Sequence, residues 1–388
     1  MQKVKLDQLC NMQSGGTPSR GKSEYYNGTI PWSKISDLEK SNDGYIYKTE
    51  EHITLEGLKS INSRFFKKGT LLLAMYGSVG KTAIAKIELS TNQAILGINL
   101  KDEKQLNIKY LRYWFLTIKE QLLNRAVGVA LSNISLGIVK DLEIPLPPLP
   151  AQQKIANILD KADELRQYNK QLIKKYDALT QSLFLDMFGD PVKNEKGWEK
   201  IGLGEISKMA SGSTPSRTNE NNFKGNIPWI KTTEVNGKII NDTLEKISEE
   251  ALENSSCRLF PKGSIVIAMY GQGKTRGQIG ILGIEAATNQ ACCVLKPSNK
   301  MNFQFLYYTL SMLYDDLRSL GRGGNQPNLN LGLLKNYELI NPPINRQNQF
   351  ADRVELIETQ KLQVQEALAK SEELFQSLLQ QAFKGELN

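Results

Sequence analysis

The chain alternates between two hydrophobic patterns, one typical of strands and one typical of long helices. Short apolar runs that end at glycine, "GTLLLAMYG" (69–77) and "GSIVIAMYG" (263–271), indicate buried strands. Stretches rich in glycine, serine, asparagine and proline separate such runs and predict turns. Apolar side chains on one face predict a helix at Ile108–Leu123 and another at Phe303–Leu317. Each strand-rich stretch is therefore expected to form a mixed α/β domain.

The pattern becomes helical after the proline-rich sequence "PLPPLP" (145–150). Seam positions then recur at alternating spacings of three and four, as in a heptad repeat. The first seam comprises Ile155, Ile158, Ala162, Leu165, Asn169, Leu172, Tyr176, Leu179 and Leu183, and the second Phe350, Val354, Ile357, Lys361, Val364, Leu368, Ser371, Phe375, Leu378 and Ala382. Helices of about 36 residues, roughly 54 Å long, with one apolar stripe each need partners, and we expect these two to pair antiparallel. The polar Asn169, Lys361 and Ser371 either fix the register or lie at the rim of the packing.

The same motifs occur twice and in the same order, at an offset near 195 residues. The pairs are "SGGTPSR" (14–20) and "SGSTPSR" (211–217), "IPW" (30–32 and 227–229), "AMYG" (74–77 and 268–271) and "TNQA" (91–94 and 288–291). We infer a tandem duplication. The predicted fold class is α+β, with two mixed α/β domains (1–150 and 191–345) joined by two long antiparallel helices (151–190 and 346–388) that form a coiled coil. The repeat is expected to be pseudo-twofold.

Charge is distributed unevenly over these four segments of a chain whose net charge is +8. Residues 1–150 carry +6 and residues 191–345 carry +4, whereas residues 151–190 are neutral and residues 346–388 carry −2. Basic domains suit a polyanion such as nucleic acid, and an internal twofold suits duplex DNA. Charge alone leaves open the alternative of a merely basic protein without such a partner.

Several classes of protein do not match the composition. No apolar run reaches the roughly 18–20 residues that span a bilayer, and "MQKVKLDQLC" at the N-terminus has no apolar signal-peptide core. The four cysteines form no Cys-x-x-Cys pair, so we interpret them as small apolar residues in a reducing cytoplasm. His52 is the only histidine, which argues against a histidine-rich metal site or a histidine-dependent triad. We expect a cytoplasmic protein with no membrane partner and no metal site.

Two motifs resemble catalytic loops but have the wrong spacing or composition. "GSVGKT" (77–82) has two residues between its glycines where a phosphate-binding loop needs four, and the second copy, "GQGKT" (271–275), has one. "NPPI" (341–344) lacks the aromatic residue with which amino-methyltransferases stack a flipped base. No Gly-x-Gly-x-x-Gly loop is present either. We predict no catalytic residues, and we interpret the glycine-rich loops as basic fingers for DNA.

Candidate DNA contacts lie where glycine, amide and hydroxyl residues cluster with a cation, because arginine can bridge guanine and amides can bridge adenine. In the first copy they are Thr17, Ser19, Arg20, Lys34, Tyr76, Ser78, Lys81, Asn92, Gln93, Ser132 and Asn133. In the second copy they are Thr214, Ser216, Arg217, Lys231, Thr233, Tyr270, Gln272, Lys274, Arg276, Asn289, Gln290, Asn325, Gln326 and Asn328.

Identity between the two copies separates these candidates into two groups. Residues that are the same in both copies, such as Thr17, Asn92 and Gln93, favour a structural role in their loops, and Trp32 and Trp229 are expected in the core. Residues that differ between matched loops are the better candidates for specificity, because two domains that read different sequences must differ somewhere.

The ordered, duplicated motifs resemble the DNA-specificity subunits of type I restriction-modification systems over essentially the whole chain. The resemblance rests on "SGGTPSR", "IPW", "AMYG", "TNQA" and "LGIVKDLEIPLPPLPAQQKIANILD", with their second copies, which end in "GGNQPNLNLGLLKNYELINPPINRQNQFA". The first copy departs from the second by placing Leu131 where the second has Gln326.

The resemblance implies that each α/β domain is a target-recognition domain for one half of a split site in double-stranded DNA. The long helices would set the gap between the half-sites. The subunit would bind no cofactor directly and would dock two methyltransferase subunits that use S-adenosylmethionine to methylate adenine. Two restriction subunits, which are motor-nucleases that use ATP and Mg, can join them. The rival hypotheses are an NTPase or methyltransferase, and a coiled-coil scaffold that does not bind DNA.

Overall fold

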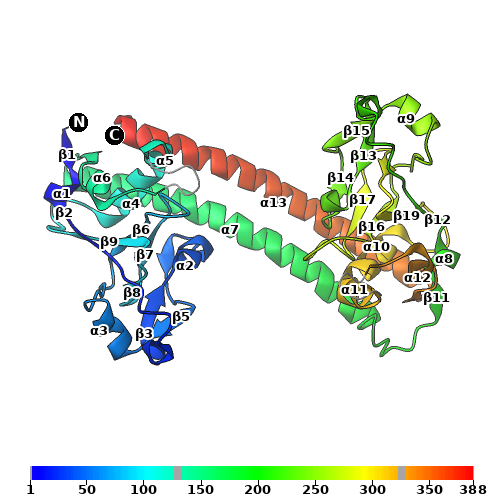
Figure 1. The fold of residues 1–388 in the computed structure, drawn as a ribbon, viewed down its shortest axis with the longest axis horizontal. Coiled ribbons are helices and arrows are strands. Elements are labelled where there is room, and N and C mark those ends of the chain that lie inside the picture. The colour runs from blue at the N-terminus through cyan, green and yellow to red at the C-terminus, as the bar shows by residue number, and fades with distance from the viewer. Residues whose placement is uncertain (1, 126–132, 322–327, 388) are drawn as a thin grey trace. The chain divides into compact units, whose positions relative to one another are not determined.

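The computed structural model describes residues 2–125, 133–321 and 328–387. The chain divides into two compact units, one made of residues 1–173 and 363–388 and the other of residues 174–362. Two long helices, α7 (Leu149–Phe188) and α13 (Ile344–Lys384), run from one unit into the other (Figure 1). The remaining elements form one head in each unit, the first head from β1 to β10 and the second head from β11 to β20.

The first head contains three small sheets and short helices. Its five-stranded sheet has the order β2 (Cys10–Ser14), β9 (Ile95–Leu100), β6 (Leu71–Ala74), β7 (Thr82–Ala85) and β4 (Tyr45–Ile46). The three-stranded sheet has the order β5 (Glu51–Ile53), β3 (Tyr26–Ser33) and β8 (Ser90–Thr91), and the third pairs β1 (Lys3–Lys5) with β10 (Glu143–Pro145). The helices are α1 (Leu6–Leu9), η1 (Ser23–Tyr25), α2 (Ile35–Lys40), α3 (Leu55–Ser60), α4 (Ile108–Thr117), α5 (Lys119–Arg125) and α6 (Leu136–Lys140).

The second head repeats this topology strand for strand. Its five-stranded sheet has the order β12 (Met209–Ser211), β19 (Cys292–Leu295), β16 (Ile265–Ala268), β17 (Ile279–Leu282) and β14 (Ile239–Ile240). The smaller sheets are β15 (Glu245–Ile247), β13 (Ile227–Ile230) and β18 (Ala287–Thr288), and β11 (Lys200–Gly202) with β20 (Glu338–Ile340). The helices are α8 (Leu203–Ile206), η2 (Glu220–Phe223), η3 (Thr232–Glu234), α9 (Glu249–Glu253), α10 (Phe303–Met312), α11 (Tyr314–Ser319) and α12 (Leu331–Lys335). The predicted α+β class with an internal repeat is confirmed.

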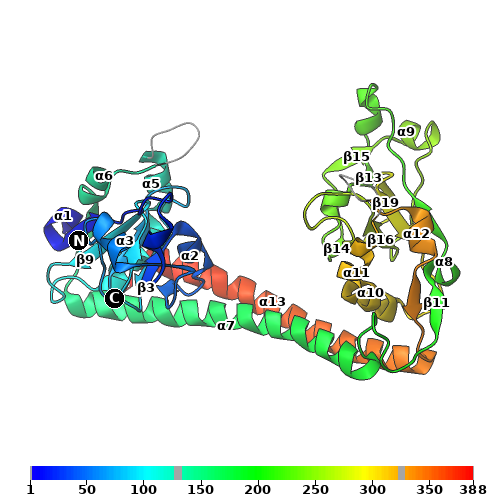
Figure 2. The ribbon, with the colours of Figure 1, turned by 60° about the horizontal axis from the view of Figure 1, so that its bottom comes forward.

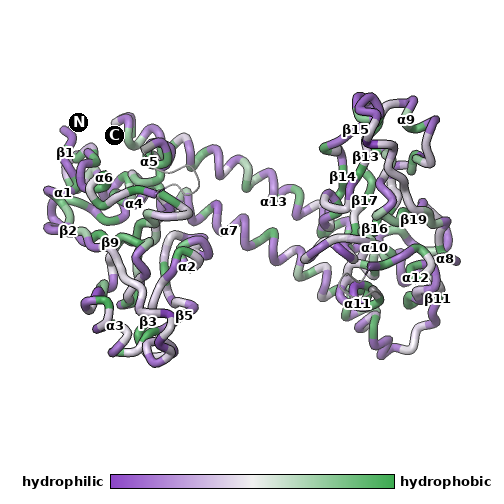
Figure 3. Tube along the Cα trace, viewed as in Figure 1, coloured by the Kyte–Doolittle hydropathy of each residue, from purple (hydrophilic) through white to green (hydrophobic). Residues whose placement is uncertain are grey.

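The central strand of each five-stranded sheet is buried on both faces, as its continuous apolar sequence predicts. Alternate residues of a strand face opposite sides. Leu71 and Leu73 of β6 accordingly belong to one hydrophobic cluster, and Leu72 and Ala74 belong to another. Figure 3 shows the hydrophobic residues concentrated along these strands. The buried strands predicted at "GTLLLAMYG" and "GSIVIAMYG" are confirmed.

The single helix predicted at Ile108–Leu123 is two helices, because α4 ends at Thr117 and α5 begins at Lys119. The Thr117 hydroxyl donates to the Trp114 carbonyl at 2.7 Å, the acceptor that the Ile118 amide would use in a continuous helix. The predicted partner at Phe303–Leu317 is likewise divided into α10 and α11, with Leu313 outside helical geometry at ψ 10°.

Each head passes into its long helix through a proline turn that is closed by a buried glutamine. Gln152 accepts from the Asn107 amide at 2.9 Å and donates to the Pro147 carbonyl at 2.8 Å. Gln347 makes the matching pair of bonds with the Asn302 amide and the Pro342 carbonyl, both at 2.8 Å. The glutamines therefore fix the direction in which each helix leaves its head.

The seam predicted along α7 is partly wrong. Leu165 and Leu179 are 47% and 49% exposed, whereas Leu159, Thr180 and Phe184 are buried. The observed buried positions recur at an average spacing closer to 3.6 residues than to 3.5. Positions predicted from a strict heptad repeat therefore move progressively away from the buried face. The ten positions predicted along α13 are all buried or half-buried.

The two long helices pair antiparallel within each unit (Figures 1 and 2). In the first unit Asn169 contacts Ser371 at 3.4 Å, and Lys170 pairs with Glu372 at 2.8 Å. The other unit contains the Asp177–Lys361 pair at 2.7 Å and the Phe184–Phe350 ring pair at 5.5 Å. The polar interruptions Asn169, Lys361 and Ser371 therefore have partners across the pair, which favours a role in register over a place at the rim. Among the described helices none is long and apolar enough to cross a membrane.

Candidate nucleic-acid interface

The repeated opening loop is held by a glycine and a tryptophan in each head. A Cβ on Gly15 would lie 2.3 Å from the Thr91 carbonyl oxygen, and one on Gly212 would lie 2.0 Å from that of Thr288. Only glycine fits such a close approach. The indole nitrogens of the matched tryptophans donate to the same loops, Trp32 to Gly16 and Trp229 to Ser213, both at 3.0 Å. Both tryptophans are 1% exposed, as predicted for core residues.

Most of the polar residues that are identical in the two heads bond within these loops. Thr17 donates to Gln93, and Thr214 makes the same bond with Gln290. The side-chain oxygens of Asn92 and Asn289 each accept a backbone amide two residues on, at 3.2 Å. These contacts support the structural role expected for identical residues. Ser19 and Ser216 are exposed on the loops, and Ser216 also bonds Thr218 at 2.7 Å.

One carboxylate joins two candidate cations in each head, and we call the three residues the cation triad. In the first head Arg20 lies 2.9 Å from one Glu51 oxygen, and Lys34 lies 2.5 Å from the other. The second head repeats the triad with Arg217 at 2.8 Å and Lys231 at 2.5 Å from the two oxygens of Glu245. Each triad retains a net charge of +1.

The arginine of each triad also lies over aromatic rings. The Arg20 guanidinium is 4.6 Å from the centroid of Tyr26 and 5.1 Å from that of Trp32. Its side chain is 55% exposed, so it is both oriented and accessible. Arg217, at 53% exposure, repeats this over Phe223 and Trp229, at 4.0 and 5.2 Å. An oriented guanidinium beside an ammonium group suits a phosphate oxygen.

The backbone of each triad lysine is fixed by an acidic residue three positions on. Asp37 accepts the Lys34 amide at 2.8 Å, and Glu234 accepts the Lys231 amide at the same distance. Each carboxylate also accepts the amide of the residue just before the next edge strand. Asp37 accepts the Glu50 amide before β5 at 3.0 Å, and Glu234 accepts the Leu244 amide before β15 at 2.8 Å. Thr233 is exposed between the lysine and this acid in the second head.

The two glycine-rich loops begin alike but are held differently. We call residues 76–81 the first finger and residues 270–276 the second finger. Tyr76 and Tyr270, at their starts, are both 39% exposed, and Tyr76 forms a β-bridge with the exposed Asn133. In the first finger Ser78 bonds Glu39, and Lys81 donates to the Ser41 carbonyl at 3.4 Å.

The Lys81 side chain is half-buried. Burial and the neighbouring Arg112 guanidinium lower the pKa of Lys81. Within the second finger Lys274 and Gln272 are exposed and Arg276 is half-buried. Among the remaining candidates Asn328 is half-buried, while Ser132, Asn325 and Gln326 lie outside the described residues.

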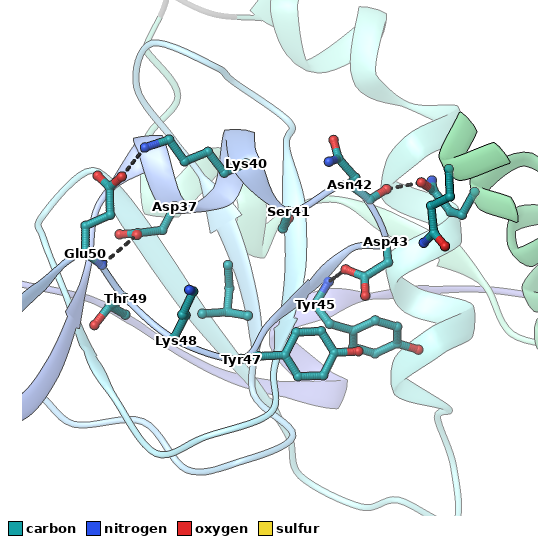
Figure 4. Close-up of a pocket in the computed structure, with 13 residues that line it drawn as sticks. Asp37, Lys40, Ser41, Asn42, Asp43, Tyr45, Tyr47, Lys48, Thr49 and Glu50 are labelled. Atoms are coloured by element: carbon teal, nitrogen blue, oxygen red, sulfur yellow. Dashed lines mark hydrogen bonds and ion pairs between the residues drawn. The ribbon is translucent and has the colours of Figure 1, made fainter. Parts of the chain in front are cut away.

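A groove of about 740 Å³ lies beside the first finger, between residues 41–50 and α7 (Figure 4). Lys40 pairs with Glu50 at its edge, and Gln167 of α7 donates to the Asn42 carbonyl at 2.7 Å. Its lining includes Asp37, Asp43 and Glu50 against Lys40 and Lys48. A groove with this balance of charge is a poor phosphate site, and none of the candidate DNA contacts lines it.

Sequence reasoning missed the two glutamates of the triads. Glu51 and Glu245 lie 194 positions apart, in "EHI" and "EKI", so the repeat held a signal for them. Acidic residues are not expected among DNA contacts, and only the fold brings these two between an arginine and a lysine.

The duplicated sheets agree with a family model that matches the chain twice. The chain belongs to the family described as the type I restriction modification DNA specificity domain, whose model matches residues 1–175 and again residues 195–370. A similar protein is the type I restriction enzyme MjaIX specificity subunit of Methanocaldococcus jannaschii, at 28% identity over 87% of this chain and 82% of that protein. The EcoR124I/EcoR124II specificity subunit of Escherichia coli is 26% identical over 71% of this chain and 69% of its own.

The fold is also similar to that of a solved structure. The type I restriction-modification S subunit of M. genitalium has a TM-score of 0.59 at 20% identity, covering 98% of this chain and 96% of that one.

Proposed function

We propose that this chain is the specificity subunit of a type I restriction-modification complex and that each head reads one half of a bipartite site in duplex DNA. The observation that carries the proposal is the cation triad, which recurs in both heads with the same partners and nearly the same distances. A duplicated phosphate anchor on two copies of one fold suits two separated stretches of the same duplex.

Division of labour with partner subunits follows from the same proposal. The heads carry the excess positive charge, whereas the long-helix segments are neutral or acidic and remain available for protein partners. We propose that two methyltransferase subunits dock on this chain and supply S-adenosylmethionine chemistry, and that restriction subunits supply ATP-driven cleavage. The chain itself would position DNA in the cytoplasm without contributing a catalytic residue.

The test has two stages, since the recognised sequence must be found first. Methylated adenines are mapped across the genome of cells that express this chain with its methyltransferase subunit, with cells lacking this chain as the control. We expect one bipartite motif. Purified complex is then titrated with duplexes in which the first, the second or both half-sites are scrambled, at several salt concentrations.

Each outcome has a distinct meaning. Loss of affinity when either half-site is scrambled supports the proposal. A chain that hydrolyses ATP or transfers methyl groups alone would contradict the assignment of a non-catalytic subunit. Weak and salt-insensitive binding to every duplex would instead favour a scaffold without a DNA site.

A further inference from the structure

The second finger is held through its backbone by helix α11. The Tyr314 hydroxyl donates to the Lys274 carbonyl at 2.6 Å. Arg318 donates to the Arg276 carbonyl at 3.1 Å and to the Tyr314 hydroxyl at 3.0 Å. Arg318 thus makes one of the two bonds that anchor the finger and also bonds the hydroxyl that makes the other.

Glycine geometry adds to this support. Three glycines of this loop have positive φ values: 141° at Gly271, 58° at Gly273 and 83° at Gly277. Residues other than glycine rarely adopt this backbone region. A Cβ on Gly277 would lie 2.8 Å from the Cγ of Arg318, so the aliphatic part of that side chain packs directly on the loop. The path of the finger is therefore set by its glycines and by α11.

Helix α11 is itself fixed to the second head. Leu317 is fully buried in the hydrophobic core, and the Tyr337 hydroxyl donates to Asp316 at 2.5 Å. Helix α11 is thus anchored to the head at two positions that lie between Tyr314 and Arg318, the residues that reach the loop.

Backbone anchoring leaves the finger side chains available. Gln272 and Lys274 are exposed, and within the described residues neither side chain has a hydrogen-bonding or ionic partner. The first finger differs, because Ser78 and Lys81 are both bonded within the protein. At the offset of 195 residues Lys119 and Leu123 replace Tyr314 and Arg318.

We propose that Tyr314 and Arg318 are positioning residues that hold the second finger so that Gln272 and Lys274 contact base edges in the half-site read by the second head. A glutamine amide can bridge adenine, and a lysine can reach guanine. The first head, which lacks both anchors, reads its half-site with other residues. This inference rests on the proposed function and concerns only one half of the DNA site.

The test compares variants of the complete complex with its methyltransferase subunits. Tyr314→Phe removes only the hydroxyl, and Arg318→Met removes the guanidinium but keeps the aliphatic packing on Gly277. Ser319→Ala is the matched control, because Ser319 is exposed on α11 and, among the residues that the structure describes, its side chain bonds only the Asp316 carbonyl. Methylation rates are measured on the mapped site and on duplexes with single base-pair changes in either half-site.

We expect each anchor variant to lose roughly fivefold in discrimination at the second half-site for each hydrogen bond removed. Discrimination at the first half-site should not change. Gln272→Ala should lose preference at one base pair of the second half-site, and Ser319→Ala should behave as wild type. Thermal unfolding of each variant checks that the fold is retained.

Two results would overturn the inference. One is unchanged discrimination in Tyr314→Phe and Arg318→Met, and the other is an equal loss at both half-sites. If the wild-type complex does not distinguish the mapped bipartite site at all, the proposed function fails instead. The two failures are therefore separable in one set of measurements.

Discussion

Each cation triad, which we propose as a phosphate anchor, contains a carboxylate, a group that a DNA-binding surface ordinarily lacks. Burial alone would raise the pKa of Glu51, but hydrogen bonds from Lys34 and Arg20 outweigh it and hold that pKa below the ordinary value. The carboxylate is therefore ionised at neutral pH and keeps both cations at a fixed separation. The carboxylate lowers the net positive charge by one, but it also holds two flexible side chains in one conformation, and this ordering offsets the lost charge.

Replacing the shared carboxylate tests whether order or charge matters more. Glu51→Gln raises the net charge by one, yet we expect specific affinity for the first half-site to fall about fivefold to twentyfold, because Arg20 and Lys34 lose their common anchor. Glu245→Gln should do the same at the second half-site. Equilibrium binding to duplexes with one scrambled half-site measures the effect.

Glu50→Gln is the matched control, since it also removes one negative charge but breaks exposed contacts outside the triad, namely the pair with Lys40 and a 3.4 Å hydrogen bond from the Ser36 hydroxyl. It should change specific affinity little. Tighter binding by Glu51→Gln and Glu50→Gln alike, with a steeper salt dependence, would show that the triad cations act as free charges.

The second triad also predicts a pH dependence of stability. The hydrogen bond from Lys231 lowers the pKa of Glu245 below its ordinary 4.5, and although burial opposes it, Arg217 adds to the lowering. A carboxylate with a lowered folded-state pKa stabilises the fold above its unfolded pKa, and this stabilisation is lost as the pH falls through the folded value.

Wild-type protein should therefore lose more stability than Glu245→Gln on acidification below pH 4.5. Urea unfolding at a series of pH values from 6 downwards measures the difference. Parallel curves for the two proteins would exclude a stabilising contribution from the triad.

At the scale of elements, a buried polar cluster docks α4 onto α7 in the first unit. Arg112 of α4 and Asp163 of α7 are each 6% exposed and lie 3.8 Å apart, and Arg166 donates its Nε to Asp163 at 3.2 Å. Beside them the Tyr113 hydroxyl donates to Asp160 at 2.7 Å. The second unit uses a tyrosine for the same docking, where Tyr308 bonds Glu358 at 3.1 Å.

Asp163→Asn should destabilise the first unit by about 3 kcal/mol, because it leaves two largely buried guanidinium groups without a counter-charge. Glu164→Gln is the matched control, since Glu164 is the exposed neighbour on the same helix, and we expect a change within about 0.5 kcal/mol. Urea unfolding followed by tryptophan fluorescence measures both. Equal stability of the two variants would show that Asp163 does not hold the head to the helix.

Elements with a strong local signal were predictable from the sequence, and side-chain partnerships were not. The strand "LLLA" is buried on both faces, so its apolar run was sufficient. The break at Ile118 coincides with a hydrogen bond from the Thr117 hydroxyl to a backbone carbonyl, and the exposure of Leu165 depends on how α7 drifts relative to a heptad. The anchors of the second finger lie 40 and 42 residues beyond the finger residues that they bond, and no periodicity connects them.

On the scale of the whole molecule, α7 and α13 each pass through both units, and polar pairs fix their register. Asn169 bonds Ser371 in the first unit, and Asp177 pairs with Lys361 in the other. The stretches between these pairs, 170–176 and 362–370, can therefore be lengthened while both pairs are kept. If the helices set the gap between half-sites, equal insertions in both stretches should change that gap.

An insertion of four residues is the appropriate length. It adds about one helical turn, or 6 Å, so the residues after it return to nearly the same face of the helix. Given the 3.4 Å spacing of base pairs, we expect the complex with both insertions to prefer a gap about two base pairs longer, with both half-sequences unchanged. Methylation mapping in cells measures both properties at once. An insertion in α7 alone is the control, since it breaks one polar pair and should abolish methylation at every gap. Altered half-sequences, or an unchanged gap in an active complex with both insertions, would show that the helices do not set the spacing.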